Sequence, residues 1–263
     1  MSEDDPLGFH RRWTRLKPPL RPDAQIIAAY RREIEGHKAH VLLLGVTADL
    51  ADIGDATVAV DFNRKMIANV WPGDTEKRKA LHGNWLDMPL QGRQFTAAIG
   101  DGVLAAIGFP QYQTFFSQLA GLLLPGARIA LRLYETPEPG ETVATVHDQT
   151  VQGKIAGFHA FKWRLAMAIA AETKQAAVPV SSIHQIFQRE FPDRAALSAA
   201  TGWSLETISE IDAYDNKPMI YHFPTRRELL ANLPDNFSRP RFVTSGDYEL
   251  AERCPLLVVD FRS

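Results

Sequence analysis

The sequence is poor in features that mark extracellular, membrane or nucleic-acid-binding proteins. Its 263 residues include one cysteine, Cys254, so no internal disulfide and no cysteine zinc site can form. No apolar run approaches the roughly 18 residues of a membrane span, and the first five residues lack the pattern of a signal peptide. Lysine and arginine number 29 against 31 acidic residues, which gives no reason to expect nucleic-acid binding. We therefore expect a soluble cytoplasmic protein, with Cys254 as a buried, inert thiol.

Several catalytic signatures are also absent. The eight histidines are scattered, with no H-E-x-x-H pair and no cluster with carboxylates, so we expect no metal. No G-x-S-x-G elbow is present, which argues against a serine hydrolase. The G-x-G-x-x-G turn that binds a dinucleotide pyrophosphate is missing as well.

Alternating apolar segments and amphipathic segments fill the first half of the chain. Helices are expected from Pro22 to Gly36, over 63–70, and from Tyr112 to Leu123. Strands are expected at 40–45, 57–61, 79–82, 95–100 and 127–134. This alternation predicts an α/β protein with a Rossmann-like, doubly wound and mostly parallel sheet.

The pattern changes after the fifth strand. Residues 135–200 show helical stretches, notably 158–172 and 181–191, and no convincing strand. Strands at 204–211, 241–244 and 256–261 and a short helix at 224–233 are expected next. We predict an α/β core at 1–134, a helical insertion at 135–200 that caps the substrate pocket, and C-terminal strands within 201–263 that complete the sheet. Residues 1–21 are expected to wrap the surface.

Two residues at neighbouring strand ends indicate a nucleoside-containing cofactor. Gly45 ends the first apolar strand and Asp61 ends the second. Ligands of open parallel sheets bind beyond the carboxyl ends of the strands. A glycine there allows close approach of the backbone, and a carboxylate can accept hydrogen bonds from ribose hydroxyls.

Four segments together resemble the class I S-adenosylmethionine (SAM) dependent methyltransferases. They lie in the family's order and fall within residues 22–134. The segments are Leu44-Gly45-Val46-Thr47, Val60-Asp61-Phe62-Asn63-Arg64-Lys65-Met66, Gly83-Asn84-Trp85-Leu86-Asp87-Met88-Pro89-Leu90 and Leu122-Leu123-Leu124-Pro125-Gly126-Ala127-Arg128-Ile129. The tetrapeptide Trp71-Pro72-Gly73-Asp74 also resembles an uncharacterised branch of that family.

The resemblance implies a role for each matching position. Gly45 and Thr47 would lie against the methionine part of SAM, and Asp61 would bind the ribose hydroxyls. Asn84 would take the place of the aspartate that receives the adenine amino group, a bond that an amide oxygen can also accept. The adenine would lie between apolar side chains, for which the candidates are Phe62, Met66, and Trp85 or Leu86.

The end of the fourth strand would bind the amino end of the methionine and admit the substrate. Asp101 and Gly102 occupy this position, and Tyr134 follows the next strand. Asp101 and Tyr134 are the candidate catalytic residues, with a solvated turn as the alternative interpretation of Asp101. Methyl transfer requires a base only when the nucleophile must lose a proton, so positioning and desolvation are a sufficient alternative.

The first motif departs from the family pattern. Leu43 stands in the usual acidic position, and Gly45 is the one glycine retained, followed by Thr47-Ala48-Asp49. SAM has no phosphate, so it does not need the glycine-rich cradle that a dinucleotide needs.

In the insertion, His147, His159, Lys162, Trp163 and Arg164 are candidates to face a substrate, although ordinary packing is the simpler interpretation. The resulting hypothesis is a SAM-dependent methyltransferase that acts on a small molecule. The alternatives are a SAM-binding sensor or partner-binding protein without transferase activity, and a nucleotide-linked oxidoreductase. The methylated atom and the oligomeric state are not indicated by the sequence.

Overall fold

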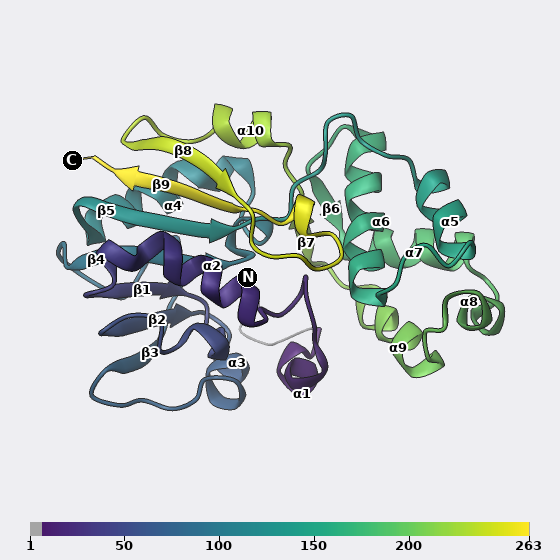
Figure 1. The fold of residues 1–263 in the computed structure, drawn as a ribbon, viewed down its shortest axis with the longest axis horizontal. Coiled ribbons are helices and arrows are strands. Elements are labelled where there is room, and N and C mark those ends of the chain that lie inside the picture. The colour runs from purple at the N-terminus through teal and green to yellow at the C-terminus, as the bar shows by residue number, and fades with distance from the viewer. Residues whose placement is uncertain (1–6, 263) are drawn as a thin grey trace.

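A seven-stranded sheet forms the larger part of the molecule (Figure 1). The computed structural model describes residues 7–262. The strand order is β3-β2-β1-β4-β5-β9-β8, in which β9 runs antiparallel to β5 and β8 and the remaining neighbours are parallel. The strands are β1 (Val41–Leu44), β2 (Thr57–Asp61), β3 (Arg78–His82), β4 (Phe95–Asp101), β5 (Leu123–Arg132), β8 (Phe237–Val243) and β9 (Leu256–Phe261). The predicted Rossmann-like, mostly parallel sheet is confirmed.

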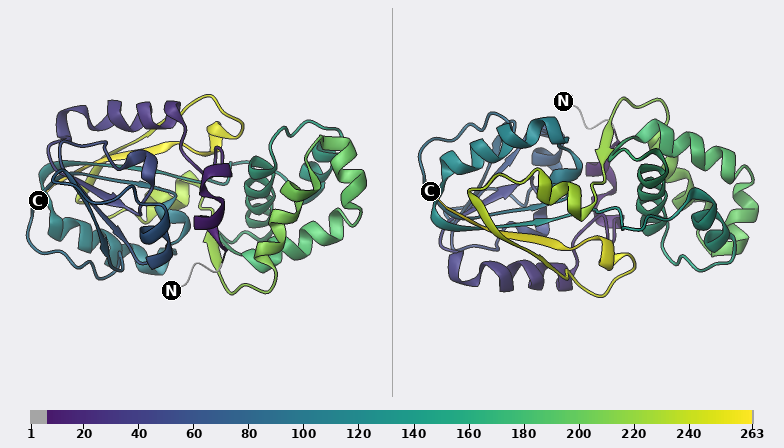
Figure 2. Two further views of the ribbon diagram at one scale, coloured as in Figure 1. Left: turned by 90° about the horizontal axis from the view of Figure 1, so that it is seen from below. Right: turned by 90° about the horizontal axis from the view of Figure 1, so that it is seen from above.

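Helices cover both faces of this sheet, which explains why its central strands are apolar throughout. In β1, Val41 and Leu43 pack in one cluster with helix α2 (Ala24–Ile34) and with side chains of α3 (Arg64–Asn69). Leu42 and Leu44 point to the other face, where α4 (Phe109–Leu122) and α10 (Arg226–Ala231) pack. Figure 2 shows α2 and α4 on opposite sides of the sheet.

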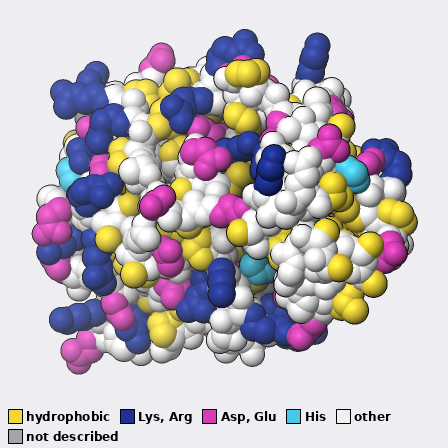
Figure 3. Space-filling view, turned by 45° about the vertical axis from the view of Figure 1, so that its right-hand side comes forward, with side chains coloured by type: hydrophobic (Ala, Val, Ile, Leu, Met, Phe, Trp, Pro, Cys, Tyr) yellow, Lys and Arg dark blue, Asp and Glu magenta, His cyan; other side chains and the backbone are white. Residues whose placement is uncertain are grey.

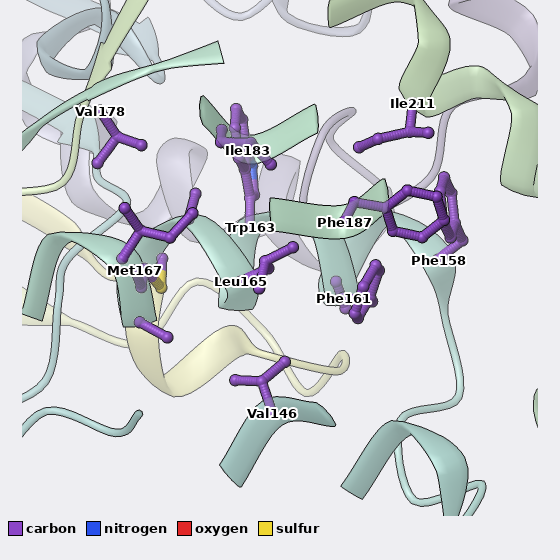
Figure 4. Packing of buried hydrophobic residues seen from close by; sticks show 14 of the residues in the cluster. Val146, Phe158, Phe161, Trp163, Leu165, Met167, Val178, Ile183, Phe187 and Ile211 are labelled. Atoms are coloured by element: carbon purple, nitrogen blue, oxygen red, sulfur yellow. The ribbon is translucent and has the colours of Figure 1, made fainter. Parts of the chain in front are cut away.

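A separate helical region follows β5 and has its own hydrophobic core (Figure 4). Phe158, Phe161, Leu165, Ile183 and Phe187 are among the side chains that fill this core. The helices are α5 (Val143–Val151), α6 (Phe158–Thr173), α7 (Val180–Glu190), α8 (Arg194–Thr201), α9 (Leu205–Ser209) and the 3₁₀ helix η5 (Glu210–Tyr214). A two-stranded antiparallel ribbon of β6 (Ala177–Pro179) and β7 (Ile220–His222) adjoins them.

Two expectations for this region are wrong. Residues 204–211 form helix rather than strand, because Ser204 caps α9 by accepting a hydrogen bond from the Thr207 amide, and Ile208 and Ile211, three residues apart, are both buried. The helical region therefore extends past residue 200. It also contains a strand, β6, which is only three residues long.

The N-terminal segment passes between the sheet and the helical region (Figures 1 and 2). It contains α1 (Phe9–Arg12) and the 3₁₀ helix η1 (Trp13–Arg15). Leu16 and Leu20 are buried in the core of the helical region, so the expectation that residues 1–21 wrap the surface is wrong for this segment. Residues 1–6 lie outside the described residues. Further 3₁₀ turns are η2 (Glu35–His37), η3 (Ala48–Leu50), η4 (Val103–Ala105) and η6 (Ala251–Arg253).

Basic and acidic side chains are interspersed on the face drawn in Figure 3. Within residues 7–262, no helix combines the length and apolar character needed to cross a membrane. Cys254 is buried as predicted, and burial raises the pKa of its thiol to about 12.

Candidate functional site

A cavity of about 220 Å³ opens where β1, β2 and β4 end. Its walls include eight of the ten residues predicted to bind a cofactor and both predicted catalytic residues, with Asp101 belonging to both groups. These residues are Gly45, Thr47, Asp61, Phe62, Met66, Trp85, Asp101, Gly102 and Tyr134. The parallel strands thus bring together side chains that lie up to about 90 residues apart in the sequence.

Hydrogen bonds join the turn after β1, which begins at Gly45, to the end of β2, where Asp61 lies. The Gly45 amide donates to the carbonyl of Val60 at 2.8 Å, and the Asp61 carboxylate accepts from the Val46 amide at 3.2 Å and from the Asn63 amide at 2.8 Å. Gly45 has a φ of +95°, a conformation that side chains other than glycine rarely adopt. The turn therefore presents bare backbone beside a carboxylate that is 8% exposed.

Three apolar side chains line the same part of the cavity. Phe62 follows β2, and Met66 lies in the first turn of α3, which Asn63 caps. The Trp85 indole donates to the Val60 carbonyl at 2.7 Å, and its Cζ2 lies 3.8 Å from the point where a Cβ on Gly45 would stand. These side chains give the Gly45–Asp61 end flat, weakly polar walls.

Asp101, at the end of β4, forms a buried ion pair with Arg132 of β5. The Arg132 guanidinium contacts both carboxylate oxygens, with Nη2 at 2.9 Å from Oδ2. The Arg132 side chain is 0% exposed and the Asp101 side chain is 4% exposed. Arg132 also donates to the Pro19 carbonyl at 2.7 Å and to the Tyr248 hydroxyl at 3.0 Å. The carboxylate is therefore held in one orientation at the edge of the cavity.

Tyr134 belongs to the same network. Its hydroxyl donates to the Pro19 carbonyl at 2.9 Å and accepts from Arg132 at 3.3 Å. Burial raises the pKa of Tyr134 well above its usual value, against the opposing effect of Arg132. A Cβ on Gly102 would stand 2.7 Å from the Tyr134 ring, so glycine at this position is required by both its φ of +70° and the neighbouring ring.

Two predicted residues, Asn84 and Leu86, do not line the cavity. The Asn84 amide oxygen accepts from the Leu86 backbone amide at 3.0 Å, within a turn that also pairs Asn84 with Asp87. Asp49, next to the glycine turn, forms a bidentate ion pair with Arg21 rather than lining the site.

Several lining residues were not singled out from the sequence. Trp13 and Leu20 come from the N-terminal segment and Tyr221 from β7, and all three line the cavity. Their contribution depends on tertiary packing between distant segments, for which the sequence carries no local signal. Trp163 of α6, a candidate from its helical spacing, also lines the cavity.

Within residues 7–262, no group of three or more histidine, cysteine, aspartate and glutamate side chains is placed to hold a metal ion. Among the insertion candidates, Arg164 pairs with Glu141, whereas Lys162 and Trp163 are buried.

No protein-family model matches the sequence, and no curated protein matches it. Among solved structures, the chain is similar to DhpI in a complex with SAM and HEP, with a TM-score of 0.56 at 14% identity, over 98% of this chain and 94% of that one. It is also similar to the 1,6-didemethyltoxoflavin-N1-methyltransferase of Burkholderia thailandensis, with a TM-score of 0.52 at 14% identity, over 98% and 87% of the two chains. The chain has the class I methyltransferase fold.

A third similar structure is named as a dehydrogenase rather than as a methyltransferase. A candidate Zn-dependent alcohol dehydrogenase from Rhodobacter sphaeroides has a TM-score of 0.59 at 9% identity, over 97% of this chain and 94% of that one. At these identities the comparisons establish the class I methyltransferase fold, and the activity must be argued from the site.

Proposed function

We propose that this protein is a SAM-dependent methyltransferase with a small-molecule acceptor. The observation that carries the proposal is the convergence of Gly45, Asp61 and Asp101 on one cavity at the ends of β1, β2 and β4. A bare glycine turn, a carboxylate at the end of the next strand and apolar walls beside them fit an adenosine group that carries no phosphate. The turn after β1 lacks the G-x-G-x-x-G sequence with which dinucleotide-binding proteins hold a pyrophosphate.

The residues divide the cavity into two ends. We propose that Asp61 accepts hydrogen bonds from the ribose and that Phe62, Met66 and Trp85 surround the adenine, because all four line the same cavity. Thr47, Asp101 and Gly102 line the side assigned to the methionine portion. When bound, SAM supplies a methyl group on a positively charged sulfur.

We propose that Asp101 and Tyr134 orient ligands rather than remove protons. Asp101 would have to leave Arg132 uncompensated in a buried site in order to act as a base. Tyr134 already donates its proton to the Pro19 carbonyl, and its raised pKa keeps the phenol neutral at physiological pH. In this proposal the two residues contribute to methyl transfer by positioning the ligands and by excluding water from them.

Calorimetry with SAM, S-adenosylhomocysteine and NADH tests the cofactor. We expect binding of SAM or S-adenosylhomocysteine at micromolar strength. Binding of neither, or tighter binding of NADH, would contradict the proposal and support a nucleotide-linked oxidoreductase. Incubation with methyl-labelled SAM and a metabolite extract separates enzyme from sensor, because a sensor would bind SAM tightly and transfer no label.

Asp61→Ala should weaken SAM binding about tenfold, since it removes a charge-assisted hydrogen-bond acceptor. The matched control is Asp55→Ala, at the exposed opposite end of the β2 segment, which should bind SAM like the wild type. Circular dichroism on both variants checks that loss of the bonds to Val46 and Asn63 has not unfolded the turn. Equal SAM affinities of the two folded variants would contradict the assignment of Asp61.

A further inference from the structure

A second cavity, of about 410 Å³, lies at the end of the sheet opposite the candidate cofactor site. We call it the basic cavity, and its polar lining consists of His37, Arg128, Ser238, Arg239, Asp260 and Arg262. Figure 1 shows this end of the sheet, where β5 begins and β9 reaches the C-terminus, away from the helical region. The basic cavity shares no lining residue with the cavity at Gly45 and Asp61.

The lining of the basic cavity carries an excess of positive charge. Its three arginines stand against one acidic residue, Asp260, among the described residues 7–262. Burial, and then the positive charge of Arg128, lower the pKa of His37 from 6.5, so this imidazole is mainly neutral at physiological pH. Three positive charges and one negative charge give the lining a formal charge of +2, whereas the whole chain has a formal charge of −2.

The carboxylate in the basic cavity is already paired. Arg128 Nε donates to Asp260 Oδ1 at 2.9 Å, and each of these side chains is 24% exposed. Arg128 Nη1 also donates to the Glu33 carbonyl at 3.2 Å, which fixes the orientation of the guanidinium. A guanidinium has five N–H donors, so Arg128 keeps donors beyond these two bonds. The excess positive charge therefore lies on Arg239 and Arg262.

Arg239 and Arg262 are exposed residues that a ligand can reach from solvent. Neither guanidinium forms an ion pair with a carboxylate of residues 7–262. By contrast, the neighbouring Arg241 of β8 pairs with Glu33 at 3.2 Å. Because an arginine remains charged at every physiological pH, the two lining arginines attract an anion throughout that range.

The backbone on two sides of the basic cavity departs from regular strand geometry. Arg239 has a φ of +55°, and the pairing of β8 with β9 shifts its register between Ser238 and Arg241. A β-bulge of this kind re-aims side chains, and the left-handed conformation costs free energy at an arginine. Gly126, on β5, has a φ of +81°, and a Cβ there would meet no atom within 4 Å. Backbone strain at an arginine beside open space is an observation that favours a binding role.

We propose that the basic cavity binds a small phosphorylated molecule, whose phosphate accepts hydrogen bonds from Arg239 and Arg262 and from the remaining donors of Arg128. Guanidinium groups match phosphate oxygens in paired, charge-assisted hydrogen bonds. A volume of about 410 Å³ suits a small molecule, and the slightly acidic chain gives no reason to expect nucleic acid. This site is separate from the proposed methyltransferase site and does not depend on that function.

Isothermal titration calorimetry at low ionic strength tests the site with inorganic pyrophosphate and with glycerol 3-phosphate. Each should bind at least about tenfold more tightly than acetate, which carries a single charge on a smaller fork of oxygens. Tighter binding of pyrophosphate would identify a polyphosphate group as the ligand, and tighter binding of glycerol 3-phosphate would identify an organic phosphomonoester. Binding of neither phosphate at millimolar concentration, or binding no tighter than that of acetate, overturns the proposal.

Three variants locate the bound phosphate. Arg239→Gln and Arg262→Gln should each weaken pyrophosphate binding about fivefold, and the double variant should show no measurable binding. The matched control is Arg31→Gln, which removes an exposed arginine of α2 that does not line the basic cavity and should bind pyrophosphate like the wild type. Circular dichroism checks that each variant is folded. Unchanged binding in the double variant, or an equal loss in the control, overturns the assignment.

Fluorescence polarisation with a labelled single-stranded oligonucleotide separates a small ligand from a nucleic acid. A cavity that takes a small molecule should bind the oligonucleotide more weakly than it binds pyrophosphate. Tighter binding of the oligonucleotide that is lost in the double variant would show that the two arginines serve a nucleic acid, and it would overturn the small-molecule assignment.

Discussion

Replacing Asp101 by asparagine should lower the thermal midpoint by roughly 5–9 °C. The change leaves Arg132 charged and fully buried, and breaking one side of a buried ion pair costs about 3–5 kcal/mol. The entropy of unfolding at the midpoint is about 2.1 cal/mol/K per residue, or about 0.55 kcal/mol/K for 263 residues. The ratio of these two quantities gives the predicted shift.

A double-mutant cycle measured by thermal and urea unfolding tests the reasoning. Asp101→Asn, Arg132→Met and the double variant should be strongly non-additive, because the double variant contains no unpaired charge. The control is Arg15→Met, which breaks an exposed pair with Glu206 whose side chains are 54% and 76% exposed, and which should cost under about 1 kcal/mol. An Asp101→Asn cost as small as that of the control, or additive effects in the cycle, would refute the argument.

Three further comparisons of variants probe the same framework by unfolding measurements. Burial lowers the pKa of Lys162 from 10.5 to about 8, so between these pH values the unfolded chain holds a proton that the folded chain has lost. As the pH rises through this range, the free energy of unfolding relative to that of Lys162→Met should increase by up to about 1.4 kcal/mol per pH unit. Parallel curves of stability against pH for the two proteins would contradict this. Gly102→Ala should lower the free energy of unfolding more than Gly126→Ala, since both glycines have a positive φ but only a Cβ on Gly102 would meet the Tyr134 ring. Equal losses of stability would show that the ring moves aside. Tyr30→Phe should lower the free energy of unfolding by about 2 kcal/mol, because the Tyr30 hydroxyl donates to the Gly100 carbonyl at 2.7 Å. Tyr112→Phe removes a buried hydroxyl without a partner and should be neutral or stabilising. The reverse order of the two effects would contradict this reasoning.

The sheet and the cofactor end of the site could be predicted because their signals are local. β1 and β2 are short apolar runs, and in a parallel sheet their final residues must meet at one edge, so the sequence alone places Gly45 and Asp61 together. Motif position was less informative for Asn84. This residue matches the family's adenine-binding position, yet its amide oxygen is used within its own turn.

The rest depends on contacts between distant segments. Arg132 lies within a buried strand where an apolar residue is expected, and nothing near it in the sequence shows that Asp101 compensates its charge. Residues 204–211 are rich in β-branched side chains and so favour a strand, but capping by Ser204 and burial of the Ile208 face in the helical core decide for helix. Trp13 reaches the cavity because a whole segment passes between the two parts of the molecule.

The antiparallel pairing of β5 with β9 has a consequence for how the chain folds during synthesis. Arg128 pairs with Asp260, so 132 residues, including the entire helical region, must leave the ribosome before this pair can form. Until then, β5 presents an open apolar edge of the kind that recruits other strands. A nascent chain of this protein would therefore spend much of its translation with an aggregation-prone strand edge uncovered.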